Sequence, residues 1–177
     1  MVDSNFERNR DLEETVEKYS DFIFRVCFLL LRDRHDTQDV LQDTFYQYLI
    51  SDIEYESEEH KKAWLLRVAQ NKCKNILKYK KIHSYISYDD VEESVVGKTS
   101  AKEDDIEEIL KLSNLNYKYK SVVILHYMEG YSVEETADIL NISLSAAKKR
   151  LQRAREKLKE FFEKYEKEGG VYYEKRQ

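Results

Sequence analysis

Apolar residues recur along the first part of the chain at the spacing of an amphipathic helix. Between Leu12 and Leu30 they follow one another at intervals of four and three residues, which places them on one side of a helix. A polar break at 32–35 ends this pattern, and Asp36 is a suitable N-cap for a second helix over about 36–50. The inward positions of the second helix are Val40, Leu41, Phe45 and Leu49.

A third amphipathic pattern follows an acidic stretch, 51–59, which favours a loop. It predicts a helix over about 60–80, with core candidates Trp64, Leu65, Val68, Ala69, Ile76 and Leu77. The periodicity ends at Ser84, and the low apolar content and clustered acids of 84–103 are typical of a linker. Further helices are predicted at about 104–113, 117–129, 132–140 and 143–162.

Composition supports an all-α fold. The chain has no proline and four glycines among 177 residues, so little interrupts its helices. We therefore predict two small helical domains, at 1–83 and 104–177, joined by a flexible linker at 84–103. No stretch approaches the roughly 20 apolar residues of a membrane span, and the N-terminus is too polar for a secretory signal. These features predict a cytoplasmic protein without direct membrane insertion.

The cysteines and histidines do not form a recognisable ligand pattern. Cys27 and Cys73 lack CxxC spacing, and the histidines are scattered. We therefore expect no metal site and no cofactor, and we expect the cysteines to be buried as small hydrophobic residues.

Charge is strongly segregated although the net charge is −5. The segment from Lys61 to His83 contains many lysines and no acid, and 143–159 is also basic, with Glu156 as its one acid. An acidic tract lies between these two segments. Because a phosphate backbone meets local basic faces and not the average charge, nucleic-acid binding remains open.

The segment 130–158 has the pattern of a helix-turn-helix. Gly130 suits a left-handed helix end, and Ser132 with Glu135 forms a capping box that starts the next helix. Asn141 tolerates a left-handed turn, and Ser143 can cap the last helix. The inward positions of this last helix are Ala147, Leu151, Ala154 and Leu158, and its outward positions include Ser145, Ala146, Lys148, Lys149, Gln152 and Arg153. Side chains near the start of such a helix can reach base edges in the major groove.

Several stretches together resemble the RNA polymerase sigma factors. The stretch 36–45, DTQDVLQDTF, is similar to the D-x-E-D-x-x-Q-x-x-F helix of their region 2. The stretch 62–71, KAWLLRVAQN, is similar to the A-W-L-x-x-I-A-x-N segment that follows it, and 129–158 resembles their region 4. The motifs occur in the expected order and are separated by a linker. They point to the small extracytoplasmic-function (ECF) class, which keeps only regions 2 and 4 and has no catalytic activity.

The resemblance implies partners for the first domain. The 36–50 helix would dock on the clamp coiled coil of the polymerase β′ subunit through Asp39, Gln42 and Asp43, whose spacing gives them one exposed face. The 60–80 helix would contact the −10 promoter element. Its contact residues would be Asn71, Lys74, Asn75 and Lys78. Tyr55 corresponds to the loop that captures an unstacked base in this family, whereas Trp64 lies in the apolar stripe and is expected to pack in the core.

The resemblance also implies partners for the second domain, which would bind the β flap and the −35 element. The −35 bases would be read by Lys148, Lys149, Gln152 and Arg153, and phosphates would be contacted by Ser145, Arg150 and Arg155. Two departures from the family make the DNA preference hard to predict. Residues 115–121 lack the proline and acid of L-P-x-x-x-R-E, and 145–150, SAAKKR, replaces G-T-V-K-S-R. An anti-sigma factor is a further expected partner.

Three alternatives remain open at this point. A stand-alone helix-turn-helix regulator would explain 130–158 but would leave the acidic face of 36–50 without a purpose. A nucleic-acid enzyme could use Glu134 and Glu135, or Asp39 and Asp43, as metal ligands, although neither pair has a third clustered ligand. A sigma-like adaptor could bind polymerase and have lost promoter recognition.

Overall fold

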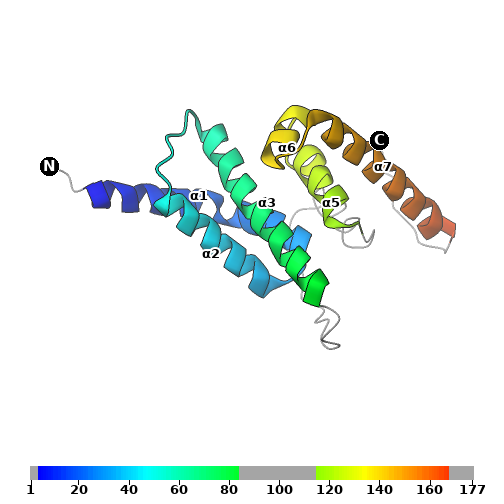
Figure 1. Cartoon of the computed structure of the whole chain (residues 1–177), viewed down its shortest axis with the longest axis horizontal. Coiled ribbons are helices and arrows are strands. Elements are labelled where there is room, and N and C mark those ends of the chain that lie inside the picture. Colours follow the sequence, from blue (N-terminus) through cyan, green and yellow to red (C-terminus); the bar gives the residue numbers. More distant parts are fainter. Residues whose placement is uncertain (1–3, 84–114, 168–177) are drawn as a thin grey trace, which may run out of the picture. The chain divides into compact units, whose positions relative to one another are not determined.

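The computed structural model describes residues 4–83 and 115–167, and every regular element within these ranges is helical (Figure 1). The predicted all-α fold is confirmed. The chain divides into two compact units, which we describe separately. The predicted linker at 84–103 and the predicted helix at 104–113 lie outside the described residues.

The first unit contains α1 (Ser4–Leu31), α2 (Arg34–Ile50) and α3 (Glu58–His83), each of which packs against the other two. Its core is formed by buried residues of all three helices. They include Ile23, Val26 and Leu30 of α1, Val40 and Phe45 of α2, and Leu65, Leu66, Ala69 and Cys73 of α3. Both cysteines are buried, as predicted.

The turn between α1 and α2 differs from the prediction. The N-cap of α2 is Asp33 and not Asp36, because Arg32 adopts a left-handed conformation (φ 56°) that ends α1 and lets α2 begin at Arg34. The Asp33 carboxylate accepts a hydrogen bond from the Asp36 backbone N–H at 2.9 Å, which lowers the pKa of Asp33. The Asp36 side chain instead forms an ion pair with Lys80 of α3.

Polar residues take core positions of α2 that the apolar pattern did not indicate. Thr37 and Thr44 are fully buried, whereas Leu41 and Leu49 are only half-buried. The threonine hydroxyls donate to backbone carbonyls one turn earlier, at 2.6 Å to Asp33 and 2.7 Å to Val40. Because each hydroxyl has a partner within its own helix, its burial leaves no unpaired polar group.

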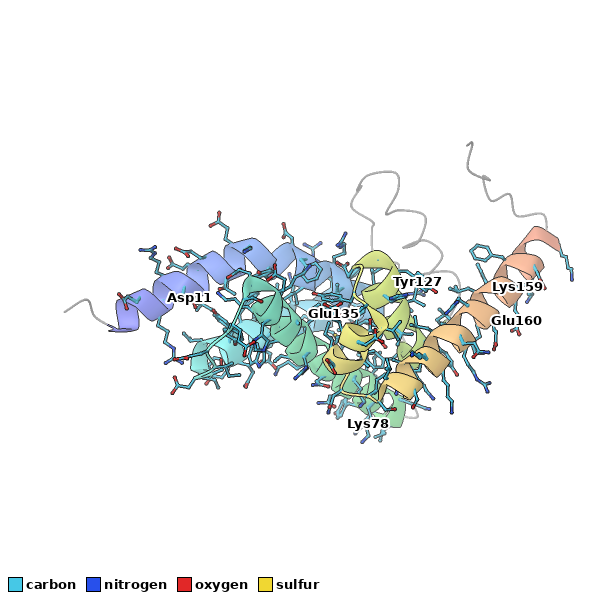
Figure 2. All side chains as sticks on the ribbon, turned by 90° about the horizontal axis from the view of Figure 1, so that it is seen from above. Asp11, Lys78, Tyr127, Glu135, Lys159 and Glu160 are labelled. Carbon is cyan, nitrogen blue, oxygen red and sulfur yellow. The ribbon has the colours of Figure 1, made fainter. Side chains whose placement is uncertain are left out.

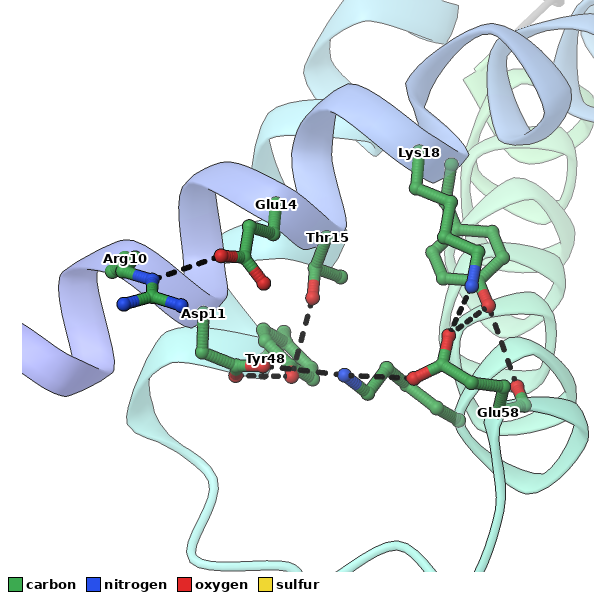
Figure 3. Close-up of polar contacts among 9 residues, drawn as sticks. Arg10, Asp11, Glu14, Thr15, Lys18, Tyr48 and Glu58 are labelled. Atoms are coloured by element: carbon green, nitrogen blue, oxygen red, sulfur yellow. Dashed lines mark hydrogen bonds and ion pairs between the residues drawn. The ribbon is translucent and has the colours of Figure 1, made fainter.

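A polar network joins α1 to the start of α3 (Figure 3). Glu58, the first residue of α3, accepts hydrogen bonds from Lys18 at 2.5 Å and from the Tyr19 hydroxyl at 2.8 Å. Lys61 forms ion pairs with Asp11 at 3.2 Å and with Glu58 at 3.4 Å. The network fixes the beginning of α3 two residues earlier than predicted. Hydrogen bonding from Lys18 lowers the pKa of Glu58 to about 2.

We expect Glu58→Gln to remove an acid-sensitive part of the stability of this unit. The pKa of Glu58 falls from its ordinary value of 4.5 to about 2 on folding. The ionised carboxylate therefore stabilises the fold fully above about pH 4.5, and this contribution is lost as the pH falls through about 2. Thermal unfolding of both proteins, followed by circular dichroism from about pH 7 downward, should show their midpoints converging over this window. Glu59→Gln, which changes an exposed neighbouring acid, should behave like the native chain.

The second unit contains α5 (Tyr117–Val123), the π-helical turn η1 (Ile124–Met128), α6 (Val133–Ile139) and α7 (Leu144–Lys167). The predicted helix at 117–129 therefore changes from α- to π-geometry within its length, and the Glu129 N–H donates to the Ile124 carbonyl at 3.0 Å. Residues Val122 to Leu125 are buried, and α5 packs against the apolar side of α7. Ala147, Leu151 and Ala154 are buried as predicted, while Leu158 is half-buried.

The predicted helix-turn-helix signals of this unit are confirmed. Gly130 has a φ of +74° and Asn141 a φ of 50°, so both occupy the left-handed region. Ser132 and Glu135 form the reciprocal capping box, with bonds of 2.8 and 3.1 Å between each backbone N–H and the other's side chain. The bond from the Ser132 N–H lowers the pKa of Glu135. Ser143 caps α7 by accepting from the Ala146 N–H at 3.2 Å.

Candidate protein and nucleic-acid interfaces

The outward side of α2 carries the acidic residues that sequence reasoning selected. Asp39, Gln42 and Asp43 are exposed, on the side of the helix opposite the buried threonines. They are not equivalent, because the Asp43 carboxylate is bound by Lys72 of α3 at 2.8 Å. Asp39 lies 3.3 Å from the ring of His35, and its side chain is about as exposed as that of Asp43, at 60% against 63%. Gln42 offers both donors and an acceptor to a partner.

Two exposed apolar residues continue the same side of α2. Tyr46 and Ile50 follow Gln42 at helical intervals of four residues, and 59% of Tyr46 and 52% of Ile50 are exposed. Sequence reasoning missed both, although a large apolar residue on an otherwise polar helix side was a visible signal. We call Asp39, Gln42, Asp43, Tyr46 and Ile50 the α2 face. Its acidic and apolar composition suits a protein partner with basic and apolar residues.

The outward side of α3 is basic and amide-rich. Asn71, Lys74, Asn75 and Lys78 are all exposed, and we call them the α3 face. Figure 2 shows Lys78 at the surface near the C-terminal end of this helix. The acids of α3 are confined to its first two residues, Glu58 and Glu59, so Lys74 and Lys78 have no acidic neighbour on their own helix. Lysines can neutralise phosphates and asparagine can form paired hydrogen bonds with a base edge, so this surface has the chemistry of a DNA contact.

The loop between α2 and α3 borders an open groove of about 730 Å³. Asp52, Glu54 and Tyr55 line it from the loop, and Arg8 lines it from α1, where its guanidinium donates to the Ser51 carbonyl at 3.1 Å. The Tyr55 ring is not free in solvent. It packs on the rings of Tyr48, Trp64 and His60, with centroids 5.7, 5.8 and 5.9 Å away.

The position of Tyr55 changes the expectation for this loop. Its half-buried ring forms part of the groove wall, and burial raises the pKa of its hydroxyl. Trp64 is half-buried and makes edge contacts with Tyr48 and Tyr55, so it supports the same wall from α3. A base entering the groove would meet this aromatic wall on one side and the carboxylates of Asp52 and Glu54 on another.

The second candidate DNA surface is the outward side of α7. Ser145, Lys148, Lys149, Gln152, Arg153 and Arg155 are exposed there, opposite the buried Ala147, Leu151 and Ala154. Arg150 differs from them, because it is half-buried and its Nε is enclosed by the protein. The Gln152 amide donates to Glu156 at 3.0 Å, which orients it along the helix. The capped start of α7 therefore presents several cationic side chains in the way that a recognition helix presents them to the major groove.

One contact bears on the enzyme alternative. The Glu135 carboxylate is engaged by the Ser132 N–H as a helix cap, so it does not face a site with Glu134. Within 4–83 and 115–167, no helix combines the length and apolar character needed to span a membrane.

Comparison with known proteins identifies the family of both units. Residues 15–82 match the family described as sigma-70 region 2, and 109–158 match sigma-70 region 4. ECF RNA polymerase sigma factor SigW of Bacillus subtilis is 26% identical over 163 residues, which are 82% of this chain and 86% of that protein. RNA polymerase sigma factor CarQ of Myxococcus xanthus is 30% identical over 138 residues, which are 74% of this chain and 77% of CarQ.

A solved structure shares the fold. The sigma factor RpoE of Bartonella quintana, crystallised with the anti-sigma factor NepR, matches with a TM-score of 0.68 and 21% identity, over 87% of this chain and 98% of that one. The order of the two sigma-70 regions, the similarity to ECF proteins and the helical fold agree with one another. The chain therefore belongs to the ECF class of the sigma-70 family and is an RNA polymerase sigma factor.

Proposed function

We propose that residues 1–83 bind core RNA polymerase and the −10 element, that 84–103 link the two parts, and that 104–177 bind the −35 element and the β flap. The observation that carries this proposal is the separation of surfaces in the first unit. An acidic and apolar α2 face and a basic α3 face occupy different helices of one small core. Such a unit can hold a protein and DNA at the same time. A regulator that binds DNA alone has no need of the α2 face.

In this proposal each surface has a distinct partner. The α2 face docks on the β′ clamp coiled coil, with Asp39 and Gln42 making the polar contacts and Asp43 contributing less because Lys72 holds it. The α3 face contacts the −10 element, and the groove beside Tyr55 accepts an unstacked base. The chain contributes recognition and no catalytic step. Its partners, the polymerase and chromosomal DNA, place it in the cytoplasm.

We assign base reading at the −35 element to the start of α7. Lys148, Lys149, Gln152 and Arg153 are exposed and can reach base edges, whereas Ser145 and Arg155 are suited to phosphates. Arg150 also belongs to the phosphate group in this proposal, although its buried Nε limits its reach.

We expect Lys149→Ala/Gln152→Ala to change promoter choice. Each good base contact contributes about 1–3 kcal/mol of discrimination, so the loss of two contacts should weaken binding to the preferred −35 sequence about thirty-fold or more. Competition between variant −35 sequences, measured with polymerase bound, separates lost base reading from a uniform loss of phosphate contacts. Lys159→Ala changes a lysine farther along α7 (Figure 2) and should leave the preference intact. If the double variant also leaves it intact, the chain is a polymerase-binding adaptor.

An anti-sigma factor is a proposed regulator. RpoE was crystallised with NepR, and CnrH with the cytosolic domain of CnrY. We propose that a partner of this kind covers the α2 face and DNA-binding surfaces of this chain and prevents polymerase binding.

Transcription with purified components tests the proposed function. The chain is combined with bacterial core RNA polymerase and a pool of genomic fragments, and the transcript starts are sequenced. Discrete starts that require both the chain and the core enzyme are the expected result. Tight, specific DNA binding by the chain alone, with no effect on polymerase, would instead identify a stand-alone regulator.

A further inference from the structure

One part of the groove beside Tyr55 is formed by α1, which the proposed function does not yet use. The residues that line the groove from this helix are Arg8, Asp11 and Leu12. The side chain of Asp11 is 51% exposed, yet each of its carboxylate oxygens is engaged by another helix (Figure 3). Its Oδ2 accepts a hydrogen bond from the Tyr48 hydroxyl at 2.5 Å, and its Oδ1 lies 3.2 Å from the Lys61 Nζ. An exposed acid with two such partners is placed to organise the groove.

The hydroxyl of Tyr48 has both of its hydrogen-bonding roles filled from α1. It donates to Asp11 and accepts from the Thr15 hydroxyl at 3.3 Å. Tyr48 is only 7% exposed, so water does not readily replace these partners. Burial, together with the Asp11 carboxylate, raises the pKa of Tyr48, so its hydroxyl keeps the proton that it donates. Because the hydroxyl is held at one end and the backbone of α2 at the other, the ring has a fixed orientation.

The ring of Tyr48 supports the ring of Tyr55. The two rings stack with centroids 5.7 Å apart and planes inclined by 22°. Trp64 meets both rings at an angle, with centroids 6.3 Å from Tyr48 and 5.8 Å from Tyr55. Among the described residues, the backbone of 52–55 forms no hydrogen bond with another backbone group, so the loop does not fix its own tyrosine. Ring packing therefore connects Asp11, through Tyr48, to the aromatic wall of the groove.

Two roles for Asp11 predict opposite effects of removing its charge. If the carboxylate only repelled phosphates, its loss would strengthen binding to every DNA probe, whatever base the groove holds. If the carboxylate positions the aromatic wall, its loss weakens binding only where a base is present to stack. The contacts favour the second role, because the charge of Asp11 is already offset by Lys61, whose side chain is only 14% exposed.

We infer that Asp11 is a positioning residue for promoter recognition. Through the Tyr48 hydroxyl it holds the aromatic wall against which an unstacked base of the −10 element is placed. The inference rests on the proposed function, in which the groove accepts such a base, and it adds a residue of α1 that acts on the base through Tyr48. A wall that is held in place before binding lets the base stack without first ordering the loop.

The test uses the full chain bound to core RNA polymerase and a promoter found in the transcription experiment. Each probe has an unpaired −10 strand, either with all its bases or with one abasic site that is moved through successive positions. We call the ratio of the two dissociation constants, at the position where removal of the base weakens binding most, the base dependence. It should be about ten-fold or more for the native chain. Asp11→Ala should lower the base dependence about five-fold, as expected for the loss of one hydrogen bond, and should not weaken binding of the abasic probe.

A double-mutant cycle shows whether Asp11 acts through Tyr48. Tyr48→Phe removes the hydroxyl and keeps the ring, so it should lower the base dependence by about the same factor. The double variant should lower it no further, because both changes break the same hydrogen bond. Tyr48→Phe removes a single oxygen atom, so it also keeps the test valid if Asp11→Ala reduces the stability of the fold. Glu14→Ala is the matched control, because it removes a nearby acid of α1 whose partner is Arg10 (Figure 3), and it should leave the base dependence unchanged.

The outcomes separate failure of this inference from failure of the proposed function. If the native complex binds neither probe, the proposed function fails and the inference fails with it. If the native complex binds both probes equally well at every position, the groove accepts no base, and only the inference and that use of the groove are overturned. Unchanged base dependence in Asp11→Ala, or losses from Asp11→Ala and Tyr48→Phe that add, would overturn the positioning role. Tighter binding of every probe by Asp11→Ala would also overturn it and would assign Asp11 an electrostatic role.

Discussion

Asp39→Arg/Gln42→Ala is expected to abolish co-elution of the chain with core RNA polymerase. The first change reverses a charge at the N-terminal end of the α2 face, and the second removes the amide one turn further on. A reversed charge against a basic partner adds repulsion to the lost hydrogen bonds, and losses of this kind reach about 2–5 kcal/mol. We therefore expect binding to weaken about hundred-fold or more, which analytical size-exclusion chromatography at micromolar concentration will detect.

A matched control tests whether the effect depends on the position of the reversed charge or only on the change in net charge. Asp21→Arg makes the same charge reversal at an exposed acid on α1, outside the α2 face, and should preserve co-elution. Asp43→Asn should have a smaller effect than the change at Asp39, because Lys72 already occupies the Asp43 carboxylate. If the double variant binds polymerase as tightly as the native chain, the α2 face is not the docking surface, and the family assignment alone would not locate it.

The second large effect is expected from Leu151→Ala. This side chain is 2% exposed, on the side of α7 that packs against α5. Removing a buried leucine side chain costs about 2–5 kcal/mol, because the transfer free energy is lost and a cavity remains. A small domain has only a few kcal/mol of stability. The second unit should therefore be largely unfolded at moderate temperature, which thermal unfolding and loss of −35 binding will show. Leu144→Ala, at a more exposed position of the same helix, should change the unfolding temperature much less.

The same variant tests the proposed division into two domains. If 1–83 fold independently, Leu151→Ala should retain co-elution with polymerase through the α2 face, and one of two unfolding transitions should remain at its native temperature. A single transition, lowered for the whole chain and accompanied by loss of polymerase binding, would contradict the independent domains.

Sequence patterns predicted best the features that depend on neighbouring residues. The capping box of Ser132 and Glu135, the left-handed Gly130 and Asn141, and the cap at Ser143 are each set by local backbone chemistry, and all were predicted correctly. The outward residues of α3 and α7 followed from helical periodicity for the same reason. Their binding partners stay predictions.

The errors have two kinds of cause, local backbone geometry and contacts between helices. Asp33 replaces Asp36 as the cap because Arg32 takes a left-handed conformation that its sequence does not favour. Thr37 and Thr44 are buried because their hydroxyls find carbonyls within α2. Tyr55 packs against aromatic residues of α2 and α3, which no pattern within its loop could indicate. Tyr46 and Tyr79 were not predicted as surface features, because helical periodicity identifies core positions and both residues lie outside the apolar side of their helix.

On the proposed contacts, the ion pair between Asp43 of α2 and Lys72 of α3 would link polymerase binding and DNA binding thermodynamically. A cation that the polymerase brings to Asp43 would compete with Lys72, and a released Lys72 would add an unpaired positive charge to α3. Affinity changes of this kind are reciprocal, so DNA at α3 would strengthen polymerase binding by the same factor. Because the ion pair is partly exposed, this cooperativity should not exceed about 1 kcal/mol, or about five-fold. The cooperativity should also decline as the salt concentration rises. Promoter DNA would then bind the complex of this chain with polymerase more tightly than it binds the chain alone.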